Sequence, residues 1–92
     1  MLSSNQRKLI SQLQKKKYRL EKNLFVAEGI KVVNELINSG WPFKNLFSTE
    51  EDFHPESELL TSDEMKKISN FKTHSQALGV FLLPEPQKIL SE

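Results

Sequence analysis

The sequence predicts an α/β domain of three layers, with helices on both faces of a small, mostly parallel sheet. Its apolar stretches are short, and they alternate between the spacing of a helix and the continuous run of a buried strand. Their order along the chain is helix, strand, helix, strand, short strand, helix and strand. The length of 92 residues, with 37% hydrophobic and 27% charged side chains, suits one globular domain.

The first half of the chain predicts two helices with a strand between them. Polar residues 3–5 can cap a helix over residues 4–16, in which apolar residues recur at spacings of three and four. Residues 24–27 are all apolar, and such a run is typical of a strand buried on both faces, as in parallel sheets. The helical spacing returns from Ile30 and stops at Gly40, a residue type favoured just beyond a helix.

The second half predicts strands around another helix. Residues 43–48 read as a strand, and strand, helix and strand within so short a stretch fit a right-handed crossover. The acidic residues 49–57 predict a loop before a brief strand at 58–60. Residues 61–64 combine a cap residue with acids, the usual opening of a helix.

The last strand is expected at residues 78–83, where an apolar run ends before two prolines. The tail 84–92 resembles an interdomain linker, and its composition fits the frayed end of a domain equally well. We therefore expect one domain over residues 1–83, followed by a linker over residues 84–92.

Charge is unevenly distributed, although the formal net charge is only +1. Residues 1–22 hold seven cations and a single acid, and residues 50–64 hold seven acids and no Lys or Arg. One end of the molecule should attract polyanions and the other should repel them. A solvated helix face would also explain the cations, but the tight cluster over residues 15–19 favours nucleic-acid binding.

The residues needed for catalysis or cofactor binding are missing. There is no cysteine, which excludes disulfides and fits a reducing cytoplasm, and three glycines cannot build a phosphate cradle. His54 and His74 have no second ligand at metal spacing, so no metal site is predicted. No signal peptide or membrane span is visible. We expect a non-catalytic binding module with no cofactor of its own.

One motif resembles a known family, the SpoU (TrmH-like) RNA 2'-O-ribose methyltransferases. Their substrate-binding domain opens with the pattern K-x-R, F-x-x-E-G, x-K-x-V-x-E. The matching residues here are Lys17, Tyr18 and Arg19, then Phe25 to Gly29, then Lys31, Val33, Glu35 and Leu36. Thr49-Glu50, residues 65–69 and residues 75–81 fall where that domain has its later elements. One departure is His74-Ser75-Gln76-Ala77, where the family usually has Thr-Pro-Gln-Gly.

The resemblance implies a fragment of a longer enzyme. A knotted methyltransferase domain, which binds S-adenosylmethionine, would follow residues 84–92, and the full-length protein would be a homodimer through that missing domain. Its substrate would be rRNA or tRNA, with no membrane partner. The front domain of this family is similar in fold to kink-turn-binding ribosomal proteins.

The expected RNA-binding residues lie together before the first strand. Lysines and an arginine can neutralise phosphates, whereas Tyr18 could either stack on a base or cover a strand edge. The set is Lys15, Lys16, Lys17, Tyr18, Arg19 and Lys22. Glu28 and Gly29 form the family's structural motif; Glu28 could cap the following helix and pair with Arg19, which could instead contact RNA.

Three further readings stay open. Trp41 could belong to the core, contact the missing domain or stack on a base, the last being the least favoured. A stand-alone kink-turn-type RNA-binding protein would have the same fold, but a glycine-rich contact loop is expected for it. A protein–protein adaptor could use the acidic segment 50–64.

Overall fold

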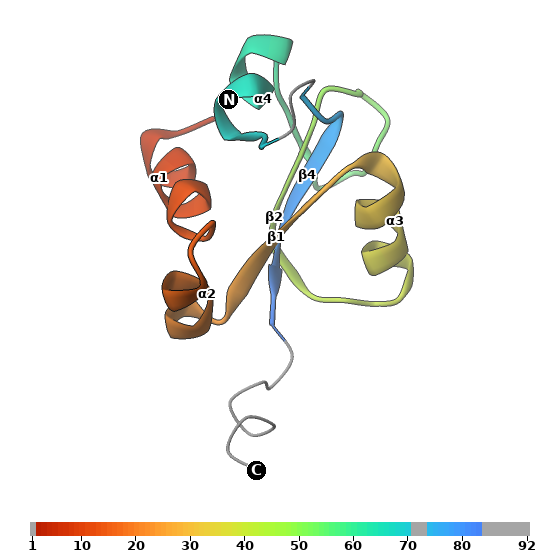
Figure 1. Ribbon diagram of the computed structural model, residues 1–92. Helices are drawn as coiled ribbons and strands as arrows, with labels where there is room; N and C mark the ends of the chain where they lie inside the picture. The colour runs from red at the N-terminus through yellow and green to blue at the C-terminus, as the bar shows by residue number, and fades with distance from the viewer. Residues whose placement is uncertain (1, 71–73, 84–92) are drawn as a thin grey trace.

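The computed structural model describes residues 2–70 and 74–83, which form three layers (Figure 1). Helices α1, α2 and α4 lie on one side of a four-stranded sheet, and α3 lies on the other. This confirms the α/β/α prediction. In chain order the elements are α1 (Ser4–Gln12), α2 (Lys16–Lys22), β1 (Leu24–Glu28), α3 (Ile30–Asn38), β2 (Phe43–Ser48), β3 (Glu58–Leu59), α4 (Ser62–Ile68) and β4 (Ala77–Leu82).

The sheet is mostly antiparallel, so the prediction of a mostly parallel sheet is wrong. The strand order is β1-β4-β2-β3, and β4 pairs antiparallel with both β1 and β2. Only β2 and β3 form a parallel pair. Strands β1 and β2 run in the same direction, as the predicted crossover requires, but β4 lies between them.

The short helix α4 explains the reversed direction of β4. Seven residues of helix span about 10 Å, whereas a six-residue strand spans about 20 Å. Helix α4 therefore does not carry the chain back to the end of the sheet where β1 and β2 begin, and β4 starts at the end where they finish. Its continuous apolar run reflects a central strand covered by helices on both faces, not a parallel one.

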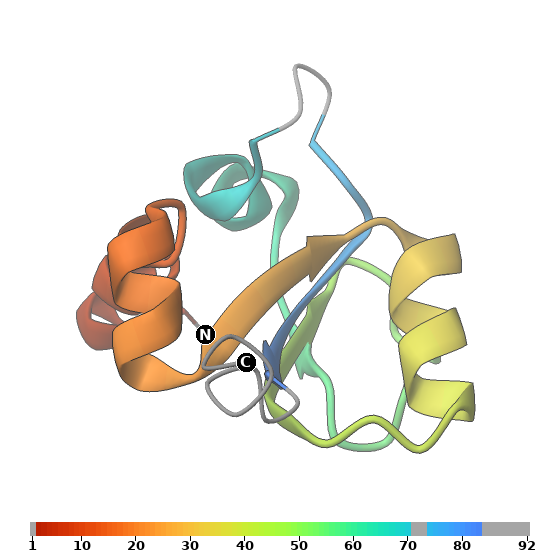
Figure 2. The same ribbon diagram turned by 60° about the horizontal axis from the view of Figure 1, so that its bottom comes forward.

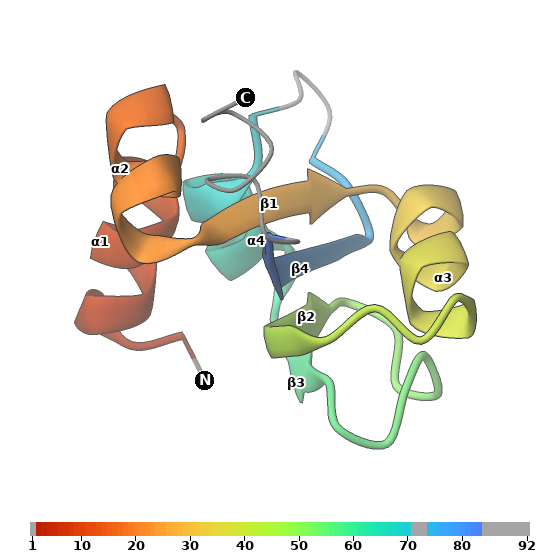
Figure 3. The ribbon, with the colours of Figure 1, turned by 90° about the horizontal axis from the view of Figure 1, so that it is seen from below.

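Side chains alternate along the strands between two apolar clusters, one on each face of the sheet. Figure 2 and Figure 3 show the helices that cover these two faces. Leu78 and Val80 of β4 point into the cluster under α1 and α4, together with Met65 and Ile68. Phe81 points into the other cluster, beneath α3. Both clusters are built around β4.

Helix α2 was not predicted, and the first helix ends at Gln12 rather than at residue 16. None of the residues of α2 is buried, so no apolar stripe marks it as a helix. One local signal does mark its end. Asn23 has a left-handed backbone (φ 58°), and asparagine is among the few residues that tolerate this conformation at a helix terminus.

The expected caps are confirmed at two helices. Ser3 accepts a hydrogen bond from the Gln6 amide and forms a capping box with it. Thr61 and Glu64 form the same arrangement at α4, where Glu64 Oε1 accepts from the Thr61 amide at 3.0 Å. Glu64 Oε2 also accepts from the Leu2 amide at 3.3 Å, which fastens the start of the chain to α4.

The carboxylate of Glu28 holds the connection between α4 and β4. Its Oε1 accepts hydrogen bonds from Ser69 Oγ at 2.6 Å and from Ser75 Oγ at 3.0 Å, and its Oε2 accepts from the Asn70 amide at 2.8 Å. The Ser75 amide donates in turn to Ser69 Oγ. One side chain at the end of β1 therefore anchors both ends of the segment that leads into β4.

The proposed linker 84–92 lies outside the described residues. Among those that are described, none of the helices combines the length and the apolar character that crossing a bilayer demands.

Glu64→Gln should reduce stability in a pH-dependent way. Hydrogen bonds from the Thr61 amide and then the Leu2 amide lower the pKa of Glu64 below its ordinary 4.5. A carboxyl group whose pKa is lower in the folded protein than in the unfolded chain stabilises the fold at any pH above the unfolded-state pKa. This contribution is lost as the pH falls through the folded-state pKa. Urea unfolding should therefore give a higher unfolding free energy for the wild type than for Glu64→Gln at neutral pH, and this difference should disappear below pH 4.5. Asp52→Asn, in an exposed loop, is the control; a gap independent of pH would contradict the argument.

Glu28→Gln should destabilise the domain by about 1 to 3 kcal/mol, because hydrogen bonds to a charged acceptor are strong. Donors bind both oxygens of the Glu28 carboxylate, and an amide has only one oxygen to accept them. Denaturant unfolding measures the loss. Glu35→Gln, an exposed change on α3, should leave the unfolding free energy unchanged. Equal stabilities of the two variants would exclude Glu28 as an anchor.

Candidate nucleic-acid interface

Helix α2 and the residue before it present the predicted basic cluster. Lys15, Lys16, Lys17 and Lys22 are all exposed. None of the four makes an ion pair with a carboxylate among the described residues, so their charges are available to a ligand. Because the helix buries none of its residues, it contributes charged surface and little core.

Tyr18 is half-buried on the same helix. The Lys17 ammonium lies 5.6 Å from the centre of its ring, at the distance of a cation–π contact. The contact orders one lysine of the cluster beside an aromatic face.

Arg19 has a structural partner within the described residues. Its Nη1 donates to the Leu13 carbonyl at 2.9 Å, which joins α2 to the end of α1. The suggested pairing of Arg19 with Glu28 is not what the structure shows. Strand β1 separates the two residues, and its five residues span about 15 Å. The Ser69, Asn70 and Ser75 donors that Glu28 binds instead come from a segment that no sequence spacing linked to it.

The suggested cap of the helix after Glu28 is also not seen. Gly29 is the N-cap of α3, and this helix has no side-chain cap hydrogen bond. The Gly29 amide instead donates to the Ala77 carbonyl at 2.8 Å, which extends the pairing of β1 with β4. Its backbone, at φ 104° and ψ 137°, is one that side-chain-bearing residues rarely adopt, and this accounts for glycine after Glu28.

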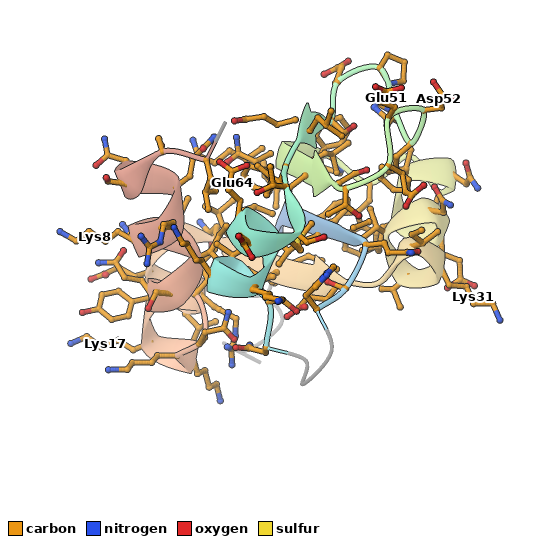
Figure 4. All side chains as sticks on the ribbon, turned by 90° about the horizontal axis from the view of Figure 1, so that it is seen from above. Lys8, Lys17, Lys31, Glu51, Asp52 and Glu64 are labelled. Carbon is orange, nitrogen blue, oxygen red and sulfur yellow. The ribbon has the colours of Figure 1, made fainter. Side chains whose placement is uncertain are left out.

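The basic helices α1 and α2 and the acidic loop lie on different sides of the domain (Figure 4). Lys8 of α1 and Lys17 of α2 project from one side, and Glu51 and Asp52 lie in the loop at the far side. These two segments of opposite charge are therefore separated in space, although Lys31 projects from the far side as well. A polyanion is attracted to the α1–α2 side and repelled from the acidic loop.

Trp41 belongs to the aromatic core beneath α3. Its indole Nε1 donates to the Leu82 carbonyl at 2.8 Å, and its ring packs edge-on against Phe25, with centroids 6.1 Å apart. The indole is half-buried and its single N–H group already has a hydrogen-bond partner, which agrees with the prediction that Trp41 packs in the core.

Neither the open pocket at the end of β4 nor any cluster of possible ligands among the described residues suits S-adenosylmethionine or a metal. An open pocket of about 390 Å³ is lined by Lys22, Asn23, Leu24, Lys44 and Leu82. It brings cations and no carboxylate toward a ligand whose sulfonium and amino groups are themselves positive. Across the described ranges, no three His, Asp or Glu side chains converge to hold a metal ion.

Comparison with known proteins places the chain in a family. The family described as "MRM3-like substrate binding domain" matches residues 5–79. Among curated proteins, no sequence match was found.

Solved structures of methyltransferases have a domain of the same fold. A Porphyromonas gingivalis protein assigned to the TrmH family of RNA methyltransferases superposes with a TM-score of 0.76 at 30% identity, covering 92% of this chain and 37% of its own. An rRNA methyltransferase from Sinorhizobium meliloti gives 0.73 at 25% identity, covering 91% and 36%. The SpoU methyltransferase AviRb from Streptomyces viridochromogenes, in complex with AdoMet, shares the fold at 14% identity and a TM-score of 0.67, covering 90% and 36%.

The chain spans little more than a third of the length of these structures. The matched residues 5–79 include all the described helices and strands except the first residue of α1 and the last three residues of β4. The chain therefore belongs to the family of MRM3-like substrate-binding domains, the domain that SpoU/TrmH-family RNA methyltransferases use to bind their substrate.

Proposed function

We propose that this domain binds the RNA substrate of an S-adenosylmethionine-dependent 2'-O-ribose methyltransferase, and that α2 is part of its RNA-binding surface. The observation that carries the proposal is the free basic cluster on α2, on the side away from the acidic loop, in a domain of a substrate-binding family. Lys15, Lys16, Lys17 and Lys22 would neutralise phosphates, and Tyr18 would stack on an unpaired base. Arg19 would position the helix.

We propose ribosomal RNA as the substrate, with tRNA as the alternative. The Sinorhizobium meliloti protein, at 25% identity, is an rRNA methyltransferase and was also solved with AdoMet bound. In this proposal, methyl transfer and the cofactor belong to the part of the enzyme that follows this domain. That part would also carry the dimer contact, and the enzyme would act in the cytoplasm.

The salt dependence of RNA binding tests the role of α2. Each neutralised phosphate steepens the plot of log affinity against log salt by roughly 0.7 to 0.9. Lys15→Glu with Lys17→Glu should therefore flatten the slope by about one to two units, without a change in thermal stability, because both side chains are exposed. An unchanged slope would leave α2 as a solvated helix and remove the proposed contact.

The matched control reverses charge elsewhere. Glu50→Lys with Glu51→Lys, on the acidic loop, should strengthen non-specific attraction slightly and leave the slope close to that of the wild type. A stronger effect here than on α2 would assign RNA binding to the opposite side.

The 92-residue chain alone should not bind S-adenosylmethionine, since no carboxylate lines the three pockets found on its described residues to pair with the sulfonium and amino groups of that cofactor. Isothermal titration calorimetry with the cofactor checks this. Stoichiometric binding at micromolar affinity would show that the cofactor site is not confined to a following domain.

A further inference from the structure

A second cationic surface lies between α1 and α4. The two helices pack side by side on the same face of the sheet (Figure 2). Two adjoining hollows follow their contact, one of about 320 Å³ and one of about 110 Å³. Arg7, Ser11 and Lys67 line both, so the hollows form one open groove, here called the α1–α4 groove.

The lining of the α1–α4 groove is suited to an anion. Arg7 and Lys8 come from α1 and Lys67 from α4, so cations lie on both walls. Their side chains make no hydrogen bond or ion pair with any other described residue, and no Asp or Glu lines the groove. Hydroxyl groups of Ser4 and Ser11 add donors between the cations.

The inner end of the groove is held by other contacts. Asn70 Nδ2 donates to Gln14 Oε1, which ties the segment after α4 to the end of α1. Gln14 Nε2 donates to the Ile10 carbonyl at 3.1 Å, and the Asn70 amide is fixed by Glu28. The two walls are therefore kept at a set separation before any ligand arrives.

We infer that the α1–α4 groove binds the phosphodiester backbone of the RNA substrate, as a second contact beside α2. This inference rests on the proposed function. Cations on two facing walls can contact phosphates from both sides, and serine hydroxyls commonly bond to phosphate oxygens or to ribose hydroxyls. Lys8 in this groove and Lys17 of α2 project from the same side of the domain, so one RNA chain can pass along both (Figure 4).

The test uses the chain with a short fluorescein-labelled RNA hairpin that has single-stranded flanks. Fluorescence anisotropy gives the affinity from about 0.05 to 0.3 M salt. Arg7→Gln and Lys67→Gln should each flatten the salt slope by roughly 0.7 to 0.9 and weaken binding several-fold at low salt. Lys66→Gln is the matched control: the same charge is removed from the neighbouring residue of the same helix, which is exposed and does not line the groove.

Ser11→Leu tests occupancy without a change of charge. Ser11 is exposed at the centre of the groove, so a larger apolar side chain fills the space and should weaken RNA binding while thermal stability is retained. Unchanged affinity in Ser11→Leu, or equal slopes for Lys66→Gln and Lys67→Gln, would overturn the inference.

The outcomes separate the two proposals. A wild-type chain that does not bind the hairpin overturns the proposed function and this inference with it. If the wild type binds, and the α2 variants flatten the slope but Arg7→Gln and Lys67→Gln do not, only the groove assignment fails. Binding of polyglutamate to the groove, with unchanged RNA affinity in its variants, would assign the groove to an acidic protein instead.

Discussion

Strand β4 unites the domain, because its backbone bonds to β1 on one side and to β2 on the other. Five of its six residues are buried, and the side chains divide between the two apolar clusters. Gly79 is required there by close packing: a methyl group at this position would come within 2.4 Å of Phe81 Cε1. The space allows the Phe81 ring to stack on Phe25, with centroids 5.8 Å apart. The packing of both apolar clusters therefore depends on the position of this one strand.

The position of β4 depends in turn on the carboxylate of Glu28. Glu28 binds donors at residues 69, 70 and 75, which brackets the segment entering the strand. Asn70 continues the chain of hydrogen bonds to Gln14 at the end of α1. An acid at the end of β1 therefore helps to position the groove between α1 and α4, without contacting the ligand we propose for it.

Local signals in the sequence predicted most of the elements. The capping residues of α1 and α4, the apolar run of β1 and the glycine after α3 each specify a boundary by short-range chemistry. Helix α2 was missed because a helix that buries nothing leaves no apolar stripe. The direction of β4 was missed because burial on both faces is common to parallel strands and to any central strand.

The candidate site was predictable only in part. A run of lysines before β1 is visible in the sequence, but Lys67 joins Arg7 only through the packing of α4 on α1, and residues sixty apart carry no common local pattern. The motif that contains Glu28 could likewise be recognised in the sequence, but its hydrogen-bond partners could not, because the tertiary fold brings them to it.

The direction of β4 also decides where the polypeptide leaves the sheet. The Leu83 amide donates to the Asn23 carbonyl at 2.8 Å, so the strand ends beside the residue that closes α2. If β4 were parallel to β1, it would end at the opposite end of the sheet, next to Glu28. Leu83, the last described residue, therefore lies beside the C-terminal end of α2 and its Lys22. A domain joined to the chain after residue 83 would therefore be tethered beside the basic helix rather than beside Glu28.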